Sequence, residues 1–169
     1  MVNPRTKKQP VEPKEKKIDI NRKDYPSIKG KLKYADQSID EIAVASTIEY
    51  LTPVERVHFM NELHRVLRPN GKVMILTPYW SASKAYADLA YQFPPVSESW
   101  YFTLNAEWRN KNFVDEVIPK ELKLTCDFDV TWGYGMHQLI QSRNQEYQQH
   151  AIIFWKEAAQ DLMATLIKR

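Results

Sequence analysis

Residues 38–77, SIDEIAVASTIEYLTPVERVHFMNELHRVLRPNGKVMILT, decide the fold. An apolar run lies within Asp40–Ser46, apolar residues at helical spacing follow it, and a second apolar run lies within Lys72–Thr77. Short continuous apolar runs are typical of strands in a parallel sheet, where both faces of a strand are buried. The stretch therefore predicts a strand, a helix and a second strand.

The helix of this unit has clear start and stop signals. Thr52 is a favourable N-cap, Pro53 suits the first helical position and Glu55 completes a capping box. The helical spacing extends to about Leu67, after which residues 69–71, Pro-Asn-Gly, predict a turn. A strand, a helix and a strand in this order form a βαβ unit with parallel strands.

Weaker patterns on both sides of this unit predict further elements. Ile18–Ile20 indicates the tip of a short strand, and Asn21–Tyr34 an irregular connection that turns near a proline and a glycine. Residues 122–130 alternate as a strand would, and residues 144–159 favour a helix. Residues 162–167 predict a closing strand that pairs with its predecessor. Together these elements predict an α/β fold.

Length and composition indicate one soluble domain. The chain has 169 residues, of which 43% are hydrophobic and 27% charged, and this length is enough for a core without disulfides or a structural metal. Its single cysteine, Cys126, cannot form an internal disulfide, so we expect a reducing, cytoplasmic setting and no metal site. No apolar run is long enough to predict a transmembrane segment.

The distribution of charge separates a basic beginning from a mildly acidic remainder. The formal net charge is +3, yet residues 1–34 hold 11 Lys and Arg against 4 Asp and Glu. Residues 1–17 contain three prolines, six basic residues and few apolar ones, a composition that predicts a disordered tail. The lysines of this tail could contact nucleic acid or another partner, or they could serve only solubility. We expect the folded domain over residues 18–169.

The scarcity of glycine excludes two nucleotide-binding loops. The chain has only four glycines, and neither the G-x-x-x-x-G-K-[ST] nor the G-x-G-x-x-G pattern is present. Both loops use the lack of a side chain to bring backbone close to phosphate groups. The sequence therefore excludes P-loop nucleotide hydrolysis and a standard dinucleotide-binding turn.

Residues 38–42, 48–53 and 63–72 resemble the middle of class I S-adenosylmethionine-dependent methyltransferases. In that family a short S-F-D-x-I strand and an E-H-L turn precede a helix that ends in L-R/K-P-G-G-K. The resemblance covers residues 18–169 and is strongest to small proteins of bacterial and phage type. It implies a Rossmann-like sheet that is truncated at its N-terminus, without the family's first strand and glycine-rich turn, and with an aromatic insertion after the central βαβ unit.

The resemblance also implies S-adenosylmethionine as cofactor and a set of residues that bind it. Asp19 would hold the ribose hydroxyls, Leu32 would pack on the adenine, and Lys31 replaces an acidic residue near the adenine amino group. Tyr50 replaces the family's usual histidine with a neutral phenol, so we expect no base at this position. The full predicted set is Asp19, Ile20, Lys31, Leu32, Ser46, Thr47 and Glu49.

Residues 78–112 are predicted to contact the substrate, because a long aromatic connection after a parallel strand is usually functional. Flat side chains stack on bases, sugars or quaternary ammonium groups, and an arginine beside a tryptophan can also bind phosphate or carboxylate. Alternatively, these rings only cover the sheet edge. The candidate substrate residues are Tyr79, Trp80, Asp88, Trp108 and Arg109.

Three hypotheses about function stay open at this point. The chain could transfer a methyl group from S-adenosylmethionine to an unknown acceptor, with catalytic residues that the sequence does not identify. It could instead be an inactive binding or scaffold protein with the same fold. In the third, another subunit supplies the missing strand. An open sheet edge would favour self-association or a partner subunit, the tail allows nucleic acid, and no membrane partner is expected.

Overall fold

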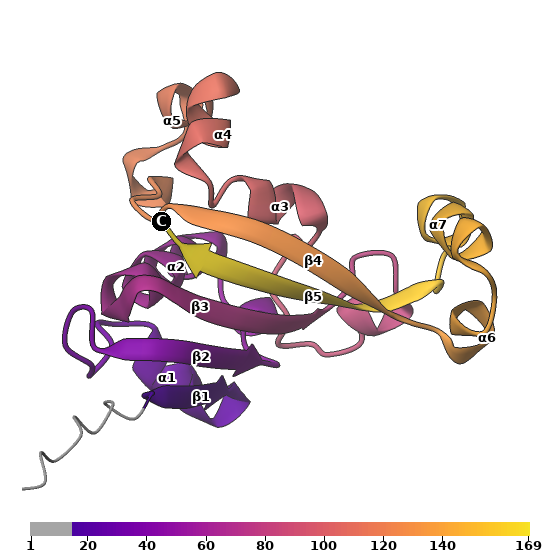
Figure 1. The fold of residues 1–169 in the computed structure, drawn as a ribbon, viewed down its shortest axis with the longest axis horizontal. Helices are drawn as coiled ribbons and strands as arrows, with labels where there is room; N and C mark the ends of the chain where they lie inside the picture. Colours follow the sequence, from indigo (N-terminus) through magenta and orange to yellow (C-terminus); the bar gives the residue numbers. More distant parts are fainter. Residues whose placement is uncertain (1–14) are drawn as a thin grey trace, which may run out of the picture.

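A computed structural model describes residues 15–169 and contains one five-stranded sheet in the order β1-β2-β3-β5-β4 (Figure 1). β1, β2 and β3 are parallel, and β5 runs antiparallel to both of its neighbours, β3 and β4. The closing strand therefore pairs with its predecessor, as predicted. The strands are β1 Lys17–Asn21, β2 Ile39–Ala45, β3 Leu67–Pro78, β4 Phe128–Met136 and β5 Ala159–Lys168.

The predicted basic tail falls mainly on residues 1–14, which lie outside the described residues. Within the predicted tail, Lys17 is the first residue of β1.

The predicted βαβ unit is confirmed. α2, Pro53–Val66, begins at a capping box in which Thr52 Oγ1 accepts from the Glu55 N–H and Glu55 Oε2 accepts from the Thr52 N–H. α2 packs its buried face, including Phe59 and Leu63, on one side of the sheet. The prediction is correct because the capping residues and the apolar face of the helix both favour a helix over the same residues.

β3 starts earlier than its sequence indicates. The predicted turn at residues 69–71 lies inside the strand, which runs without interruption from Leu67. The pairing with β2 slips here, since Leu67 is opposite Ile39 while Lys72 is opposite Glu41. Residues 68–71 thus form a bulge, and Asn70 takes a left-handed conformation with φ of 62°. A turn-forming triplet therefore bends the strand instead of preceding it.

Two other predicted boundaries are wrong. Residues 122–127 contain no strand, because Asn61 Oδ1 accepts from the N–H groups of Thr125 and Cys126 and so replaces a strand partner. The predicted helix over residues 144–159 ends earlier, and Ala159 already belongs to β5. The remaining helices are α1 Tyr25–Ile28, α3 Glu98–Phe102, α4 Ala106–Lys111, α5 Val114–Val117, α6 Gln138–Gln141 and α7 Gln145–Phe154, with 3-10 turns at Arg22–Asp24, Ile48–Tyr50, Ser83–Tyr86 and Lys120–Leu122.

The two faces of the sheet differ in their cover. One face packs on α2 and forms the core, whereas the opposite face is exposed along β3 and β5 (Figure 1). Register places Leu76 beside Met163 on the exposed face, with Met74 one row away, and these three side chains are 39–46% exposed. We call Met74, Leu76 and Met163 the open-face cluster. Parallel strands are normally covered on both faces, so this surface is unusual.

Candidate functional site

The carboxyl ends of the three parallel strands lie together at one edge of the sheet. Asn21 at the end of β1 is opposite Ala45 at the end of β2, and Ala45 is opposite Leu76 of β3. The Ser46 N–H also donates to the Leu76 carbonyl at 3.4 Å. Ligands of open α/β sheets bind at this edge, so the segments that follow the three strands form the candidate site.

Four of the predicted cofactor residues lie around one small cavity of about 160 Å³ beside β1. Asp19 is exposed, whereas Ile20 is buried in the core. The Leu32 N–H donates to Glu62 Oε2 at 2.7 Å, which ties this segment to the last turns of α2. The structure thus brings Asp19, Ile20, Lys31 and Leu32 together.

The other three predicted cofactor residues follow β2 and do not line that cavity. Ser46 is exposed and takes a left-handed conformation with φ of 49°, a strained arrangement often found at functional sites. Thr47 is buried and donates through Oγ1 to the Ala45 carbonyl. Glu49 is 6% exposed, and its Oε2 has no hydrogen-bond partner among the described residues.

The environment of Glu49 favours the protonated acid. Burial raises the pKa of its carboxyl, and the backbone N–H groups of Glu49 and Thr47, followed by the Arg56 guanidinium, oppose this only in part. Thr77 Oγ1 and Tyr101 Oη are also buried, and the Thr77 hydroxyl partly offsets the effect of burial on the pKa of Tyr101. Burial raises the pKa of Tyr101, and the Glu49 carboxylate raises it further. The edge between β2 and β3 therefore contains buried polar groups, among them the unpartnered oxygen of Glu49.

Arg56 connects this edge to the aromatic segment. Its guanidinium is buried and donates to the carbonyls of Ile48 and Leu51 after β2, and to those of Gln92 and Pro94. The Gln92 N–H in turn donates to the Glu49 carbonyl at 2.7 Å. Sequence reasoning missed the buried role of Arg56, because an arginine in an amphipathic helix is normally predicted to lie at the surface.

Asp88 lies beside Tyr50, away from the other predicted substrate residues. The Tyr50 hydroxyl donates to Asp88 Oδ2 at 3.0 Å, and Arg22 pairs with the same carboxylate while its guanidinium lies 4.6 Å from the Tyr50 ring centre. Burial, followed by the hydrogen bond to Asp88, raises the pKa of Tyr50. Tyr50 is therefore a neutral hydrogen-bond donor that links the segments after β1 and β2.

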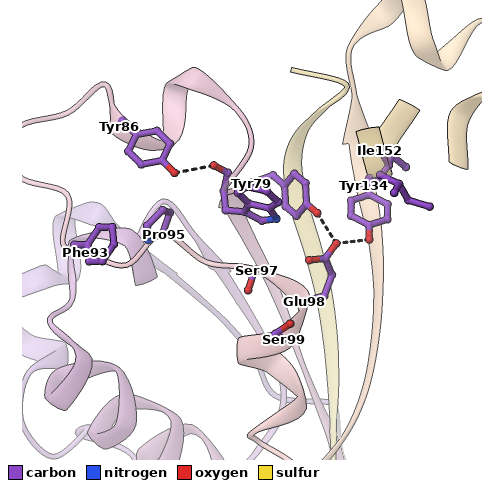
Figure 2. A pocket seen from close by; sticks show the side chains of 11 residues that line it. Tyr79, Tyr86, Phe93, Pro95, Ser97, Glu98, Ser99, Tyr134 and Ile152 are labelled. Carbon is purple, nitrogen blue, oxygen red and sulfur yellow. Dashed lines mark hydrogen bonds between the residues drawn. The ribbon is translucent and has the colours of Figure 1, made fainter. Parts of the chain in front are cut away.

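Tyr79 and Trp80, just after β3, line a cavity with a volume of about 540 Å³ (Figure 2). Glu98 of α3 accepts hydrogen bonds through Oε1 from the hydroxyls of Tyr79 and Tyr134, and Figure 2 shows both phenols pointing at this carboxylate. We call this cavity the aromatic pocket. Its lining residues are Tyr79, Trp80, Tyr86, Phe93, Pro95, Ser97, Glu98, Ser99, Tyr134, Ile152 and Ile153.

The two phenols of the pocket are donors and not bases. Burial raises the pKa of Tyr134 to about 12, and the hydrogen bond to Glu98 adds to the shift. The same two causes, in the same order, raise the pKa of Tyr79. Sequence reasoning missed Glu98 and Tyr134. Glu98 could have been singled out as an acidic residue within the aromatic stretch. Tyr134 belongs to a strand distant in sequence, so no local pattern connects it with this stretch.

Trp108 and Arg109 do not line the aromatic pocket. The Trp108 ring stacks on Phe102. Arg109 is 3% exposed, and its guanidinium donates to the carbonyls of Thr103 and Cys126 at 2.7 and 3.0 Å. These contacts hold the start of β4 against α4, so we do not include either residue in the proposed acceptor site.

Residues 15–169 contain no group of three or more His, Cys, Asp or Glu side chains that could hold a metal ion. In the same residues, no helix is both long enough and apolar enough to cross a membrane.

Comparison with known proteins agrees with this fold. Residues 5–75 match the family model of the methyltransferase domain. A SAM-dependent methyltransferase from Archaeoglobus fulgidus aligns with a TM-score of 0.54 and 13% identity, over 85% of this chain and 64% of that one. The family model thus matches part of the chain, and the structural comparison shows a fold shared with a class I S-adenosylmethionine-dependent methyltransferase.

Two further solved structures are similar at a lower level. A SAM-dependent methyltransferase from Thermotoga maritima aligns with a TM-score of 0.45 and 12% identity, over 84% of this chain and 61% of that one. A methyltransferase solved with the Trm112 activator from Haloferax volcanii aligns with a TM-score of 0.42 and 14% identity, over 83% and 58%. The chain thus spans less than two thirds of these three structures. No curated protein sequence matches it.

The residues at the sheet edge fit the chemistry of S-adenosylmethionine in part. The exposed carboxylate of Asp19 suits ribose hydroxyls, and the unpartnered Oε2 of Glu49 can accept from a hydroxyl or an ammonium group. The cavity beside Asp19, however, is about 160 Å³ in volume, while small-molecule sites typically span roughly 300–1,000 Å³. This cavity alone is therefore smaller than a typical small-molecule site.

Proposed function

We propose that the chain acts as an S-adenosylmethionine-dependent methyltransferase and carries the acceptor side of the reaction. The observation that carries the proposal is the aromatic pocket beside the carboxyl edge of β2 and β3. Phe93 lines the pocket, and the preceding residue, Gln92, bonds to the main chain of Glu49. Tyr79 lines it from the end of β3. The residues that bind the methyl acceptor and those that bind the methyl donor would thus face each other across the carboxyl edge of the sheet.

The chain's own residues would mainly position the reactants, which is the principal need of methyl transfer. Asp19 would hold ribose hydroxyls, while Ser46, Thr47 and Glu49 would line the donor side next to β2. When bound, S-adenosylmethionine supplies a sulfonium methyl group, whose carbon accepts a lone pair from the acceptor while the C–S electrons stay on sulfur. The aromatic walls would orient the acceptor atom toward the donor.

A calorimetric titration with S-adenosylmethionine and S-adenosylhomocysteine tests the donor site. We expect binding by the full chain, at least about tenfold weaker for Asp19→Ala because the ribose hydroxyls lose a charged acceptor. Asp129→Ala is the matched control, since Asp129 is an exposed carboxylate on the far edge strand. Absence of binding at millimolar ligand, or equal loss in both variants, would contradict the proposal.

A second candidate function is a binding protein that assembles with its own copy through the open-face cluster. Lys72 and Asp161 lie at opposite ends of this apolar strip, because Lys72 is opposite Ile167 and Asp161 is opposite Pro78. A two-fold rotation that places two such faces together would bring the lysine of one copy over the aspartate of the other. Within one chain Lys72 pairs with Glu41 and Asp161 with Lys84, so the contact would extend these surface pairs between copies, which favours a second copy as the occupant.

A further inference from the structure

The aromatic pocket has an unusual balance of charge and ring surface. Five of its eleven lining residues are aromatic, Glu98 is the one acidic residue, and no lysine, arginine or histidine is among them. Trp80, Tyr86 and Phe93 are 47%, 59% and 79% exposed, so their rings are accessible to a ligand. The electron-rich faces of aromatic rings and a carboxylate both attract cations.

Glu98 is held in place yet keeps an unused oxygen. Both of its hydrogen bonds, from Tyr79 and Tyr134, go to Oε1. Among the residues that the structure describes, Oε2 accepts no hydrogen bond, and Glu98 forms no ion pair with a lysine or arginine. Figure 2 shows the carboxylate between the two phenols, on the side of the pocket away from Tyr86 and Phe93. A bound cation would therefore meet a fixed carboxylate at one end and aromatic rings at the other.

We propose that the aromatic pocket binds an aliphatic amine in its ammonium form and that this amine is the methyl acceptor. The role of the amine as methyl acceptor rests on the proposed methyltransferase function, whereas the binding of an ammonium group by the pocket does not. Glu98 Oε2 would accept a hydrogen bond from the ammonium N–H. Trp80, Tyr86 and Phe93 would surround its carbon substituents, and a volume of about 540 Å³ admits a small organic amine.

The same groups disfavour other classes of acceptor. A phosphate or carboxylate would meet Glu98 without any lysine or arginine in the lining to offset the repulsion. Nucleic acid would bring its phosphates close to the negative charge of Glu98, although a nucleobase alone could stack on the rings. An ammonium ion is the ligand that uses both the carboxylate and the rings.

An ammonium nitrogen must lose its proton before its lone pair can attack a methyl carbon. The raised pKa values of Tyr79 and Tyr134 keep both phenols protonated, so neither can take that proton at neutral pH. Glu98 is the remaining ionisable group of the lining and would receive it. The released proton then passes to solvent through the open mouth of the pocket.

The test compares a cation with its neutral isostere on the full chain, without S-adenosylmethionine. N,N-dimethylethanolamine and choline are compared with 3,3-dimethylbutan-1-ol, which has the shape of choline but no charge, and isothermal titration calorimetry measures the binding of each. We expect the two cations to bind at least about tenfold more tightly than the alcohol. Equal affinity for all three, or preference for the alcohol, would overturn the proposal.

Variants separate the carboxylate from the rings. Glu98→Gln keeps the side-chain shape and should weaken N,N-dimethylethanolamine about tenfold, choline less because it has no N–H to donate, and the alcohol not at all. Trp80→Leu, at an exposed position, provides a second test if Glu98→Gln does not fold, and it should weaken choline several-fold. Glu121→Gln is the control, since this exposed glutamate lies outside the pocket. Unchanged cation binding in Trp80→Leu and in folded Glu98→Gln would overturn the proposal.

The two proposals fail in different ways. If cations bind selectively but the chain transfers no methyl group from S-adenosylmethionine, the ammonium site stands and the proposed function fails. If methyl transfer is found only to neutral or anionic acceptors and no cation binds, the proposed function stands and the ammonium site is contradicted.

Discussion

At the scale of single residues, Glu49 shows how burial changes the chemistry of a side chain. Its carboxyl is 6% exposed and has an unpartnered oxygen at the edge where ligands of such sheets bind. Nothing in its sequence context, directly before Tyr50, separates it from an ordinary acidic residue at the entry of a helix. Packing of the aromatic segment over β2 gives Glu49 its raised pKa.

Glu49→Gln should stabilise the protein at neutral pH. Because burial raises the folded-state pKa of Glu49, the native state holds this proton more strongly than the unfolded chain does. Stability is therefore lost as the pH rises from about 4 through the folded-state pKa, and the amide removes this loss. We therefore expect Glu49→Gln to have a higher free energy of unfolding than wild type at pH 7.

Urea unfolding at several pH values measures this effect. The difference between wild type and Glu49→Gln should shrink toward about pH 4, where the wild-type carboxyl is protonated in both states. The exposed Glu121→Gln serves as the control and should follow the wild type at every pH. A Glu49→Gln variant that is less stable than wild type at pH 7 would show that the carboxylate is stabilising.

At the scale of elements, the bulge at the start of β3 depends on a glycine. A Cβ atom on Gly71 would lie 2.9 Å from the Arg68 carbonyl oxygen and 3.1 Å from that of Asp40. Backbone atoms cannot move aside as the end of a side chain can, so the strand would have to shift. Gly30, in contrast, has no atom within 4 Å of its Cβ position.

This pair of glycines gives a matched prediction. Gly71→Ala should lower the free energy of unfolding by about 1–3 kcal/mol, because overpacking forces the backbone to move. Gly30→Ala should leave it unchanged or raise it by roughly 0.4–1 kcal/mol, because it reduces the entropy of the unfolded chain. Thermal and urea unfolding measure both. Equal effects at the two positions would show that the bulge has no tight packing.

At the scale of the whole molecule, the sheet has one covered and one exposed face. The open-face cluster lies on the two central strands, where burial by a second copy would remove apolar side chains from water. This arrangement predicts self-association through the face of the sheet. It differs from association through the β1 edge, the route that the sequence suggested.

Light scattering across a concentration series tests this assembly. We expect the mass to approach that of a dimer with rising concentration, and Met163→Lys to weaken the association about tenfold or more, because it places a charge within the apolar strip. Leu139→Lys is the control, since Leu139 is an equally apolar residue of α6 that is 70% exposed. A monomeric mass at every concentration would contradict the second candidate function.

The amino-acid sequence by itself determined the βαβ unit, the capping of α2 and the aromatic character of the segment after β3. These features depend on side chains close together in the sequence, such as Thr52 and Glu55, whose interactions survive any arrangement of the rest. It also indicated Tyr79 and Trp80 as candidate site residues, because the connection after a parallel strand lies at the edge where such sheets bind ligands.

Only the tertiary structure decided which of these side chains meet. The carboxylate of the aromatic pocket comes from Glu98, and one of its two donors, Tyr134, lies in a strand 36 residues further on. The start of β4 likewise depends on Asn61, which is distant in sequence. The bulge in β3 depends on its pairing with β2. The physical reason is that burial and hydrogen bonding depend on distances in space, which local patterns of residues do not contain.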